Sequence, residues 1–208
     1  METSFNPSAA GRQAYLNVVA AYAMDMAGYE HNPRTAYVSA DMPFRALRSF
    51  HGVGVNFMND QIGLFTHTKL NLQYAFQMPL FKGHLRLGAE VGFISEKFDG
   101  SQVDLGDSSD PAFSTADLTG SSIDLGAGLF YTHGQWYGGA SVHHLNSPLV
   151  SLGDNNELKI LPTYYFTGGG NISFRNPFIT LKPSLLFRTD GTGWRGDITG
   201  RLVYNDGD

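Results

Sequence analysis

Alternation between apolar residues and small or polar ones recurs almost from end to end of this 208-residue chain. The clearest case is Leu85–Ser95, where Val91 and Phe93 fall on one face and Arg86 and Glu90 on the other. A period of two is that of a β-strand, in which successive side chains point to opposite faces. The pattern therefore predicts an all-β, antiparallel fold with one apolar and one polar face per strand.

The alternating segments are long. About ten can be counted, each of roughly 9–12 residues, the length that a tilted strand needs to cross a bilayer, whereas soluble strands average about 5–6 residues. They are Tyr15–Asp25, Thr35–Phe44, Phe50–Asn59, Leu70–Met78, Leu85–Ser95, Ile123–Tyr131, Gln135–Leu145, Thr163–Phe174, Ile179–Arg188 and Asp197–Tyr204. The length favours an outer-membrane β-barrel. A soluble antiparallel barrel or sandwich explains the alternation equally well but the strand length less well.

Composition agrees with strands that each hide half of their residues from lipid. Aromatic residues make up 13% of the chain and charged residues only 16%, against about 25% in typical soluble domains. No apolar run approaches the roughly 20 residues of a transmembrane helix. The net charge of −5 excludes a nucleic-acid partner, and the absence of cysteine excludes disulfides and thiolate metal sites. Met1–Gly11 shows no secretory signal, so an outer-membrane protein must have its signal peptide outside this sequence.

Short and long connections separate the strands. Tight hairpins are predicted near Lys82–Gly83, Gly134–Gln135 and Asp190–Gly193, and longer polar segments at Gly100–Gly120 and Asn146–Leu161. The first long segment carries four aspartates whose spacing matches no known calcium loop, so a solvated surface loop is the preferred interpretation over calcium binding. They are Asp104, Asp107, Asp110 and Asp117.

Charged residues within the strands fall on the face rich in small residues. They are Arg86, Glu90, Asp124, Lys182, Arg188, Asp197 and Arg201. That face is expected to line the lumen, because Lys or Arg facing lipid at mid-bilayer costs about 2–4 kcal/mol. Mixed signs favour cross-strand pairing inside a filled barrel over a single-sign channel. Glycines on the same face, such as Gly52, Gly88 and Gly128, leave room for larger neighbours.

Aromatic residues near strand ends, among them Phe44, Phe130 and Trp136, are expected to form interfacial girdles.

Residues that could carry chemistry form no convincing constellation. The adjacent His143 and His144 should point to opposite faces of a strand and so cannot chelate one metal together. No serine sits in a Gly-x-Ser-x-Gly elbow, no carboxylate pair stands out as acid and base, and no glycine-rich loop opens a helix. The sequence therefore predicts no catalytic, cofactor-binding or metal-binding residues, and a protein that is not an enzyme.

Several segments that follow one another over nearly the whole chain form a recognisable set. They are Asn6–Gly11, Tyr37–Phe44, Gly52–Gly63, Leu85–Gly88 with Gly92-Phe93, Asp124–Tyr131, Tyr137–Pro148, Thr167–Gly170 and Leu181–Leu186. In this order they resemble the PorP/SprF family of type IX secretion membrane proteins of Bacteroidetes. The positions that match family motifs are expected to have turn and strand-end roles. They are Asn6, Pro7, Gly11, Asp60, Gly63, His144 and Pro148.

The resemblance implies one β-barrel domain over residues 1–208 that lacks its signal peptide and its last strands, with about 14 strands in the full protein. It implies an outer-membrane component of type IX secretion that binds or anchors cargo bearing type IX C-terminal domains. Other secretion and gliding-motility components, and outer-membrane lipid, are the further partners it implies.

Two other functions stay open. The first is an outer-membrane porin or hydrophobic-solute transporter, which would need a ligand-lined lumen or a single-sign constriction. The second is a surface enzyme, which would need a Ser-His or carboxylate cluster at one rim.

Overall fold

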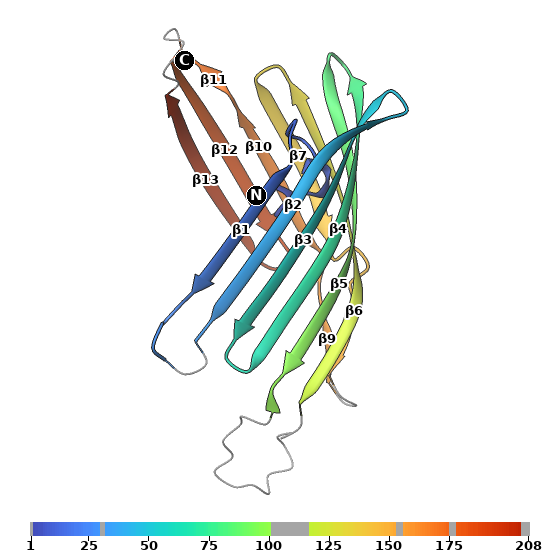
Figure 1. Ribbon diagram of the computed structural model, residues 1–208, viewed down its shortest axis with the longest axis vertical. Coiled ribbons are helices and arrows are strands. Elements are labelled where there is room, and N and C mark those ends of the chain that lie inside the picture. The colour runs from blue at the N-terminus through green and yellow to red at the C-terminus, as the bar shows by residue number, and fades with distance from the viewer. Residues whose placement is uncertain (1, 30–31, 101–116, 153–155, 175–177, 205–208) are drawn as a thin grey trace, which may run out of the picture.

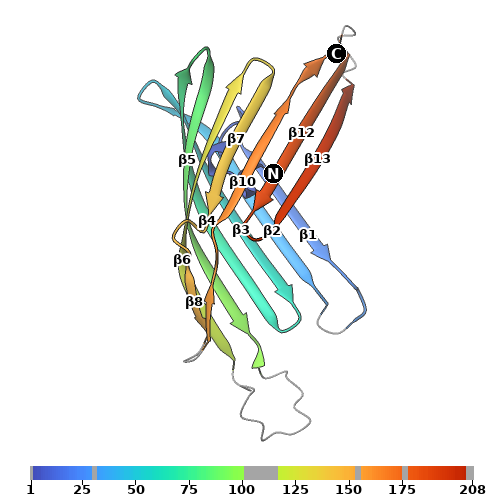
Figure 2. The ribbon, with the colours of Figure 1, turned by 180° about the vertical axis from the view of Figure 1, so that it is seen from behind.

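The computed structural model describes residues 2–29, 32–100, 117–152, 156–174 and 178–204, most of them in strands. One curved sheet wraps round a central space (Figures 1 and 2). The strands are β1 (Asn17–Met24), β2 (Arg34–Ala46), β3 (Ser49–Ile62), β4 (Phe65–Leu80), β5 (Gly83–Phe98), β6 (Leu118–His133), β7 (Trp136–His143), β8 (Leu149–Leu152), β9 (Asn156–Lys159), β10 (Thr163–Gly170), β11 (Ile172–Ser173), β12 (Ile179–Thr189) and β13 (Trp194–Tyr204). Two 3-10 turns, η1 (Glu2–Ser4) and η2 (Pro7–Ala9), precede them.

The sheet follows the chain from hairpin to hairpin. Its order is β1-β2-β3-β4-β5-β6-β7-β10-β12, and both β11 and β13 pair with β12. All of these pairings are antiparallel. The strands β8 and β9 form a separate hairpin within the connection from β7 to β10. The predicted all-β, antiparallel fold is confirmed. Within the described residues, β1 and β13 are edge strands and the sheet is not closed into a complete barrel.

All ten predicted segments contain a strand, but the central strands are longer than predicted. The strands β4, β5 and β6 have 16 residues each, against the expected 9–12. The pairing of β4 with β5 continues beyond the residues that alternate between apolar and polar. It reaches the Phe65–Phe98 pair, whose ring centroids lie 4.9 Å apart. Cross-strand aromatic contacts of this kind stabilise a hairpin beyond the part that lies in the apolar belt.

The two ends of the sheet differ. Tight turns join β2 to β3 at Leu47-Arg48 and β4 to β5 at Phe81-Lys82, and both residues of each turn have positive φ. Two-residue turns of this kind match the twist of the flanking strands. This end is called the tight-turn end. The opposite end, where β5 stops at Phe98 and β6 starts at Leu118, is called the loop end (Figure 1).

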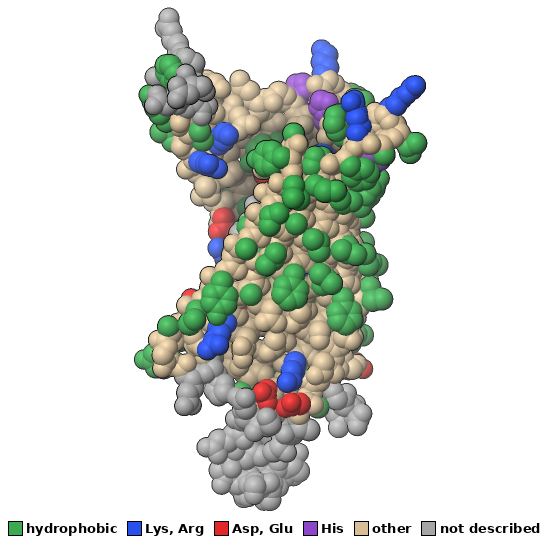
Figure 3. Space-filling view, viewed as in Figure 1, with side chains coloured by type: hydrophobic (Ala, Val, Ile, Leu, Met, Phe, Trp, Pro, Cys, Tyr) green, Lys and Arg blue, Asp and Glu red, His purple; other side chains and the backbone are tan. Residues whose placement is uncertain are grey.

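The outer face is apolar over its middle. Leu87, Val91 and Phe93 of β5 are exposed, whereas Arg86 and Glu90 between them are each only 4% exposed. Figure 3 shows hydrophobic side chains spread over the outer face in view, with charged side chains gathered mainly toward its two ends. A belt of this kind suits lipid contact.

One member of the predicted aromatic girdle lies elsewhere. The prediction that Phe130 faces the membrane interface is wrong, because this ring is fully buried on the inner face. Its ring stacks on the ring of Tyr137, and its centroid lies 4.8 Å from the Cζ carbon of the Arg12 guanidinium.

Among the described residues, no helix is long and apolar enough to cross a membrane.

Candidate functional site

The first residues of the chain fold into the central space as a plug, defined here as Glu2–Arg12. Both 3-10 turns belong to it, and η2 contacts β3, β4, β5 and β6. Asn6 begins η2, and its Oδ1 accepts hydrogen bonds from the N–H and the hydroxyl of Ser8, at 3.0 and 2.6 Å. Pro7 follows at the first position of the turn, where its missing N–H costs nothing. The Nδ2 of Asn6 donates to the Leu129 carbonyl at 3.1 Å, which ties the plug to β6.

The inner wall of the sheet binds the plug through its main-chain carbonyls. Asn56 and Gln73 donate to the Thr3 carbonyl at 3.0 and 2.8 Å. Ser141 and the Nε2 of His143 both contact the Phe5 carbonyl.

Arg86 adds the strongest of these donors. Its guanidinium donates to the carbonyls of Ser8, at 2.9 Å, and Ala10. Through these two bonds Arg86 links the wall to the second half of the plug. The same side chain donates to Gln77 at 2.8 Å, which fixes its position on the wall.

Glycines in the wall make space for the plug. A Cβ at Gly52 would overlap the Ala10 carbonyl, one at Gly88 would overlap the backbone of Ser8, and one at Gly128 would overlap the Asn6 amide. The larger neighbour expected beside these glycines is therefore the N-terminal segment itself. Close backbone approach is one of the established reasons for glycine within a strand.

Gly11 lies at the next-to-last position of the plug. Its φ of +62° suits glycine, and its N–H donates to the Asp41 carboxylate at 2.9 Å. Asp41 also accepts from Asn17 at 3.0 Å, so one buried carboxylate holds both the end of the plug and the start of β1.

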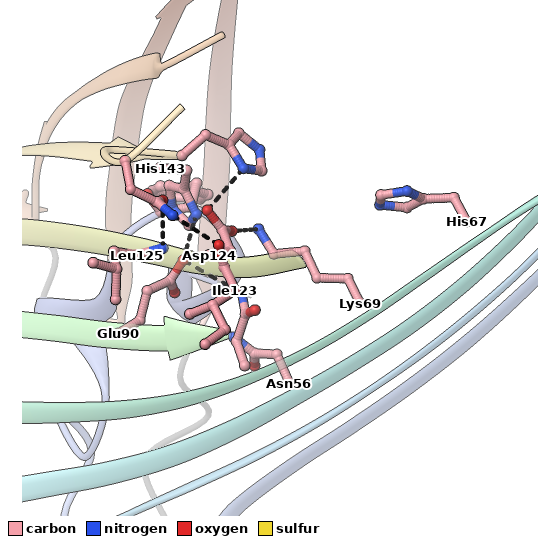
Figure 4. Close-up of polar contacts among 12 residues, drawn as sticks. Asn56, His67, Lys69, Glu90, Ile123, Asp124, Leu125 and His143 are labelled. Carbon is pink, nitrogen blue, oxygen red and sulfur yellow. Dashed lines mark hydrogen bonds and ion pairs between the residues drawn. The ribbon is translucent and has the colours of Figure 1, made fainter. Parts of the chain in front are cut away.

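Next to the plug, two carboxylates organise an inner polar network. Asp124, 1% exposed, pairs with the Lys69 ammonium and the His144 ring, both at 3.0 Å. Glu90 pairs with the His143 ring at 2.7 Å and accepts from Gln73 at 2.8 Å. Figure 4 shows these side chains converging from β4, β5, β6 and the end of β7. Since His143 also donates to the plug, the network and the plug share a residue.

The two adjacent histidines do not behave as predicted. The expectation that they point to opposite faces is wrong, because both rings reach inner carboxylates. His144 has a φ of +58°, which ends the regular strand and turns its ring back toward Asp124. Asn146 holds this turn by bonding the N–H of Leu125 and the carbonyl of Ile123, at 3.1 and 2.7 Å.

A cavity of about 500 Å³ lies between the plug and the loop end. Side chains of β2, β3, β4, β7, β10 and β12 line it, together with Ser4 of the plug. Its size is that of a small-ligand site. The lining residues are Ser4, Thr35, Tyr37, Asn56, Met58, His67, Lys69, Asn71, His143, His144, Ile160, Tyr165 and Arg188.

The structure brings three of the seven charged residues predicted for the lumen into the buried interior, namely Arg86, Glu90 and Asp124. The other four lie on β12 and β13 near the open edge, where Lys182, Arg188 and Arg201 are exposed and Asp197 is half-buried. Asp197 accepts from Arg195 rather than pairing across strands.

The remaining family-motif positions have local roles. Asp60 accepts from the Thr35 hydroxyl at 2.6 Å, and Gly63 has a φ of +60° in the turn from β3 to β4. The Pro148 carbonyl accepts from the N–H of Ile160 at 3.0 Å, which closes the base of the β8–β9 hairpin.

Sequence reasoning missed Lys69 and His143 as members of the network. Lys69 lies two residues before Asn71 on the polar side of β4, so extending the alternation by one step would have placed it inside. The plug leaves no periodic signal, because its contacts with the wall join residues that are 30 to 138 positions apart in the chain.

Metal binding finds no support in the described part of the chain, where no three potential ligands are grouped closely enough to hold an ion. Asp104, Asp107 and Asp110 of the acidic loop lie outside the described residues. Asp117, the last of that set, pairs with Lys97 at 3.5 Å.

Replacing Asn6 with alanine will destabilise the plug. The change removes the cap of η2 and the hydrogen bond to Leu129, and a lost cap or buried hydrogen bond costs about 1–3 kcal/mol. The expected result is a lower midpoint of urea unfolding in detergent micelles. Asn171→Ala, at an exposed asparagine, is the matched control and should leave the midpoint unchanged. Equal midpoints for both variants would contradict the role of Asn6.

Comparison with known proteins gives one match. The family model of the type IX secretion system membrane protein PorP/SprF matches residues 2–207, so the match begins in the plug and continues through β13. Comparisons with curated proteins and with solved structures found no match.

Proposed function

Because the chain belongs to the PorP/SprF family of type IX secretion system membrane proteins, we propose that it is an outer-membrane barrel that binds or anchors secreted cargo. The family match over residues 2–207 is the observation that carries this proposal. Members of this family are membrane components of a secretion system, and the family is not a known enzyme family.

The filled interior supports a binding role over a conducting one. The plug occupies the space inside β3 to β6, and the wall satisfies its carbonyls with buried side chains. A porin needs a water-filled lumen. The mixed-sign, paired charges beside the plug also differ from the single-sign ring expected of an ion-selective channel.

Two surfaces divide the work in this proposal. The apolar outer belt contacts outer-membrane lipid, because its leucine, valine and phenylalanine side chains are exposed and no other described part of the chain packs over them. The loop end, where the cavity opens beyond the plug, binds the cargo. Periplasmic secretion or gliding components bind at the tight-turn end.

Cargo capture is tested by a pull-down from outer membranes with the full-length protein as bait. The expected result is recovery of proteins that bear a type IX C-terminal domain, and loss of their secretion when the gene is deleted. An unrelated outer-membrane barrel of similar size is the control bait. If the bait returns no such protein and its deletion leaves secretion intact, the proposal fails, and solute uptake into liposomes becomes the test of the porin alternative.

A further inference from the structure

We propose that the tight-turn end binds the anionic headgroups of the lipid leaflet around it, through Arg48 and Lys82 at the tips of two hairpins. This inference goes beyond the proposed function, because it concerns the lipid that holds the barrel and not the cargo. It needs only the membrane location of the family. The distribution of charge, the residues at the hairpin tips and the height of the strands support it.

The tight-turn end carries basic side chains and, among the described residues, no acidic one. Its segments are 42–53, 77–88, 129–140, 168–174, 178–183 and 200–204. The exposed basic residues of these segments form no ion pair with any described carboxylate. They are Arg45, Arg48, Lys82, Lys182 and Arg201. A positive end without carboxylates of its own attracts an anionic surface.

The loop end has the opposite character. Acidic residues lie at the strand ends and turns on this side, and several of them pair with neighbouring basic groups. They are Asp25, Asp60, Glu96, Asp99, Asp117, Glu157 and Asp190. An attraction for anionic headgroups is therefore expected at one end of the barrel only.

Each basic residue at a hairpin tip stands beside a strongly exposed apolar one. Leu47, 94% exposed, precedes Arg48, and Phe81, 84% exposed, precedes Lys82. In both views the tip of the β2–β3 hairpin leans away from the rest of the sheet (Figures 1 and 2). An apolar side chain next to a cation suits the membrane interface, where the apolar group meets lipid and the cation reaches a phosphate.

The height of the strands favours lipid over an acidic protein as the occupant. The strands β4 and β5 have 16 residues each, and the exposed apolar residues Leu87, Val91 and Phe93 lie near the middle of β5. At about 3.3 Å per residue and a tilt of about 40°, such strands rise about 40 Å. A bilayer with its headgroups is about 40–45 Å thick. The tips therefore end within the headgroup layer and not in the water beyond it.

The two tryptophans of the chain allow each end to be measured separately. Trp136 starts β7 at the tight-turn end and is 58% exposed, and Trp194 starts β13 at the loop end and is 77% exposed. Trp194→Phe leaves the first reporter and Trp136→Phe leaves the second. The full chain in mixed detergent and lipid micelles is titrated with brominated phosphatidylglycerol or brominated phosphatidylcholine, whose bromines quench tryptophan on contact. Both lipids reach both ends in a micelle, so a difference between the reporters comes from the protein.

Beside Trp136 we expect the anionic lipid to bind about fivefold or more tightly than the zwitterionic one, because each Lys or Arg near an anionic lipid surface contributes about that factor. Beside Trp194 the two lipids should bind equally. In 0.5 M sodium chloride the preference at Trp136 should shrink, because salt screens exposed charges.

Variants of the tips show which residues cause the preference. Arg48→Gln with Lys82→Gln should abolish it at Trp136, whereas Arg48→Lys with Lys82→Arg keeps both charges and should retain it. The matched control is Lys97→Gln with Arg195→Gln, two exposed basic residues of the loop end, which should leave the preference unchanged.

Equal binding of the two lipids beside Trp136 would overturn the inference, and so would a preference that survives Arg48→Gln with Lys82→Gln. If the lipids bind equally while this double variant recovers fewer periplasmic proteins in the pull-down, an acidic protein occupies the tight-turn end, and the lipid inference is wrong. Neither result bears on cargo binding, because the tips belong to neither the plug nor the loop end.

Discussion

Replacing Gly88 with valine will drive the plug out of the lumen. A Cβ at this position overlaps the backbone of Pro7 and Ser8, and backbone cannot rotate away as a flexible side chain can. Overpacking a core usually costs about 1–3 kcal/mol even where side chains can adjust. Amide hydrogen exchange over residues 3–11 is the measurement, and protection there should fall about a hundredfold or more, each tenfold corresponding to about 1.4 kcal/mol.

The control for this variant is Gly196→Val. Gly196 is also a strand glycine, but a Cβ there meets nothing within 4 Å. Its substitution should leave the exchange of the plug unchanged. If Gly88→Val retained full protection of residues 3–11, the plug would not lie against β5 as the structure places it.

Replacing Asp124 with leucine will produce the largest loss of stability expected from one residue of the network. The change leaves the Lys69 ammonium, 13% exposed, without its partner in the interior. Removing one member of a buried ion pair costs about 3–5 kcal/mol, because the remaining charge is uncompensated. Urea unfolding in detergent micelles, followed by tryptophan fluorescence, measures the loss of unfolding free energy.

The double variant Asp124→Leu with Lys69→Met separates charge imbalance from lost packing. Exchanging a whole buried pair for apolar residues of similar volume is often neutral or stabilising. The double variant should therefore recover much of the stability lost in the single one, even though it carries more changes. A double variant at least as unstable as Asp124→Leu would mean that the Lys69 charge is not the source of the loss.

The sequence was sufficient to predict the wall of this structure. Alternation depends on neighbouring residues, so it located every one of the ten long strands and placed Arg86, Glu90 and Asp124 opposite the apolar face. Strand length was underestimated because the strands stay paired as far as their ends, for example at the Phe65–Phe98 contact. At these ends, apolar and polar residues no longer alternate with the buried and exposed faces.

The contents of the lumen could not be predicted in the same way. Residues of the plug form two short turns without periodicity, and their partners lie across the barrel. The glycines gave a partial signal, since they showed that something large had to fit against the wall, but not what it was. The position of the His144 ring depends on its own positive φ, which is uncommon for a residue other than glycine and cannot be predicted from the local sequence pattern.

The measurement that tests the filled lumen most directly is a disulfide between the plug and the wall. A Cβ at Gly54 would lie 3.3 Å from the Cβ of Ala10, close to the roughly 3.5–4.5 Å found in disulfides, and the chain has no other cysteine. The variant Ala10→Cys with Gly54→Cys should cross-link almost completely when cells are treated with a mild oxidant, detected as a mobility shift that reductant reverses. Ala10→Cys with Gly196→Cys should not cross-link within the chain. Failure of the first pair to form a disulfide would contradict a plug inside the barrel and return the porin alternative to consideration.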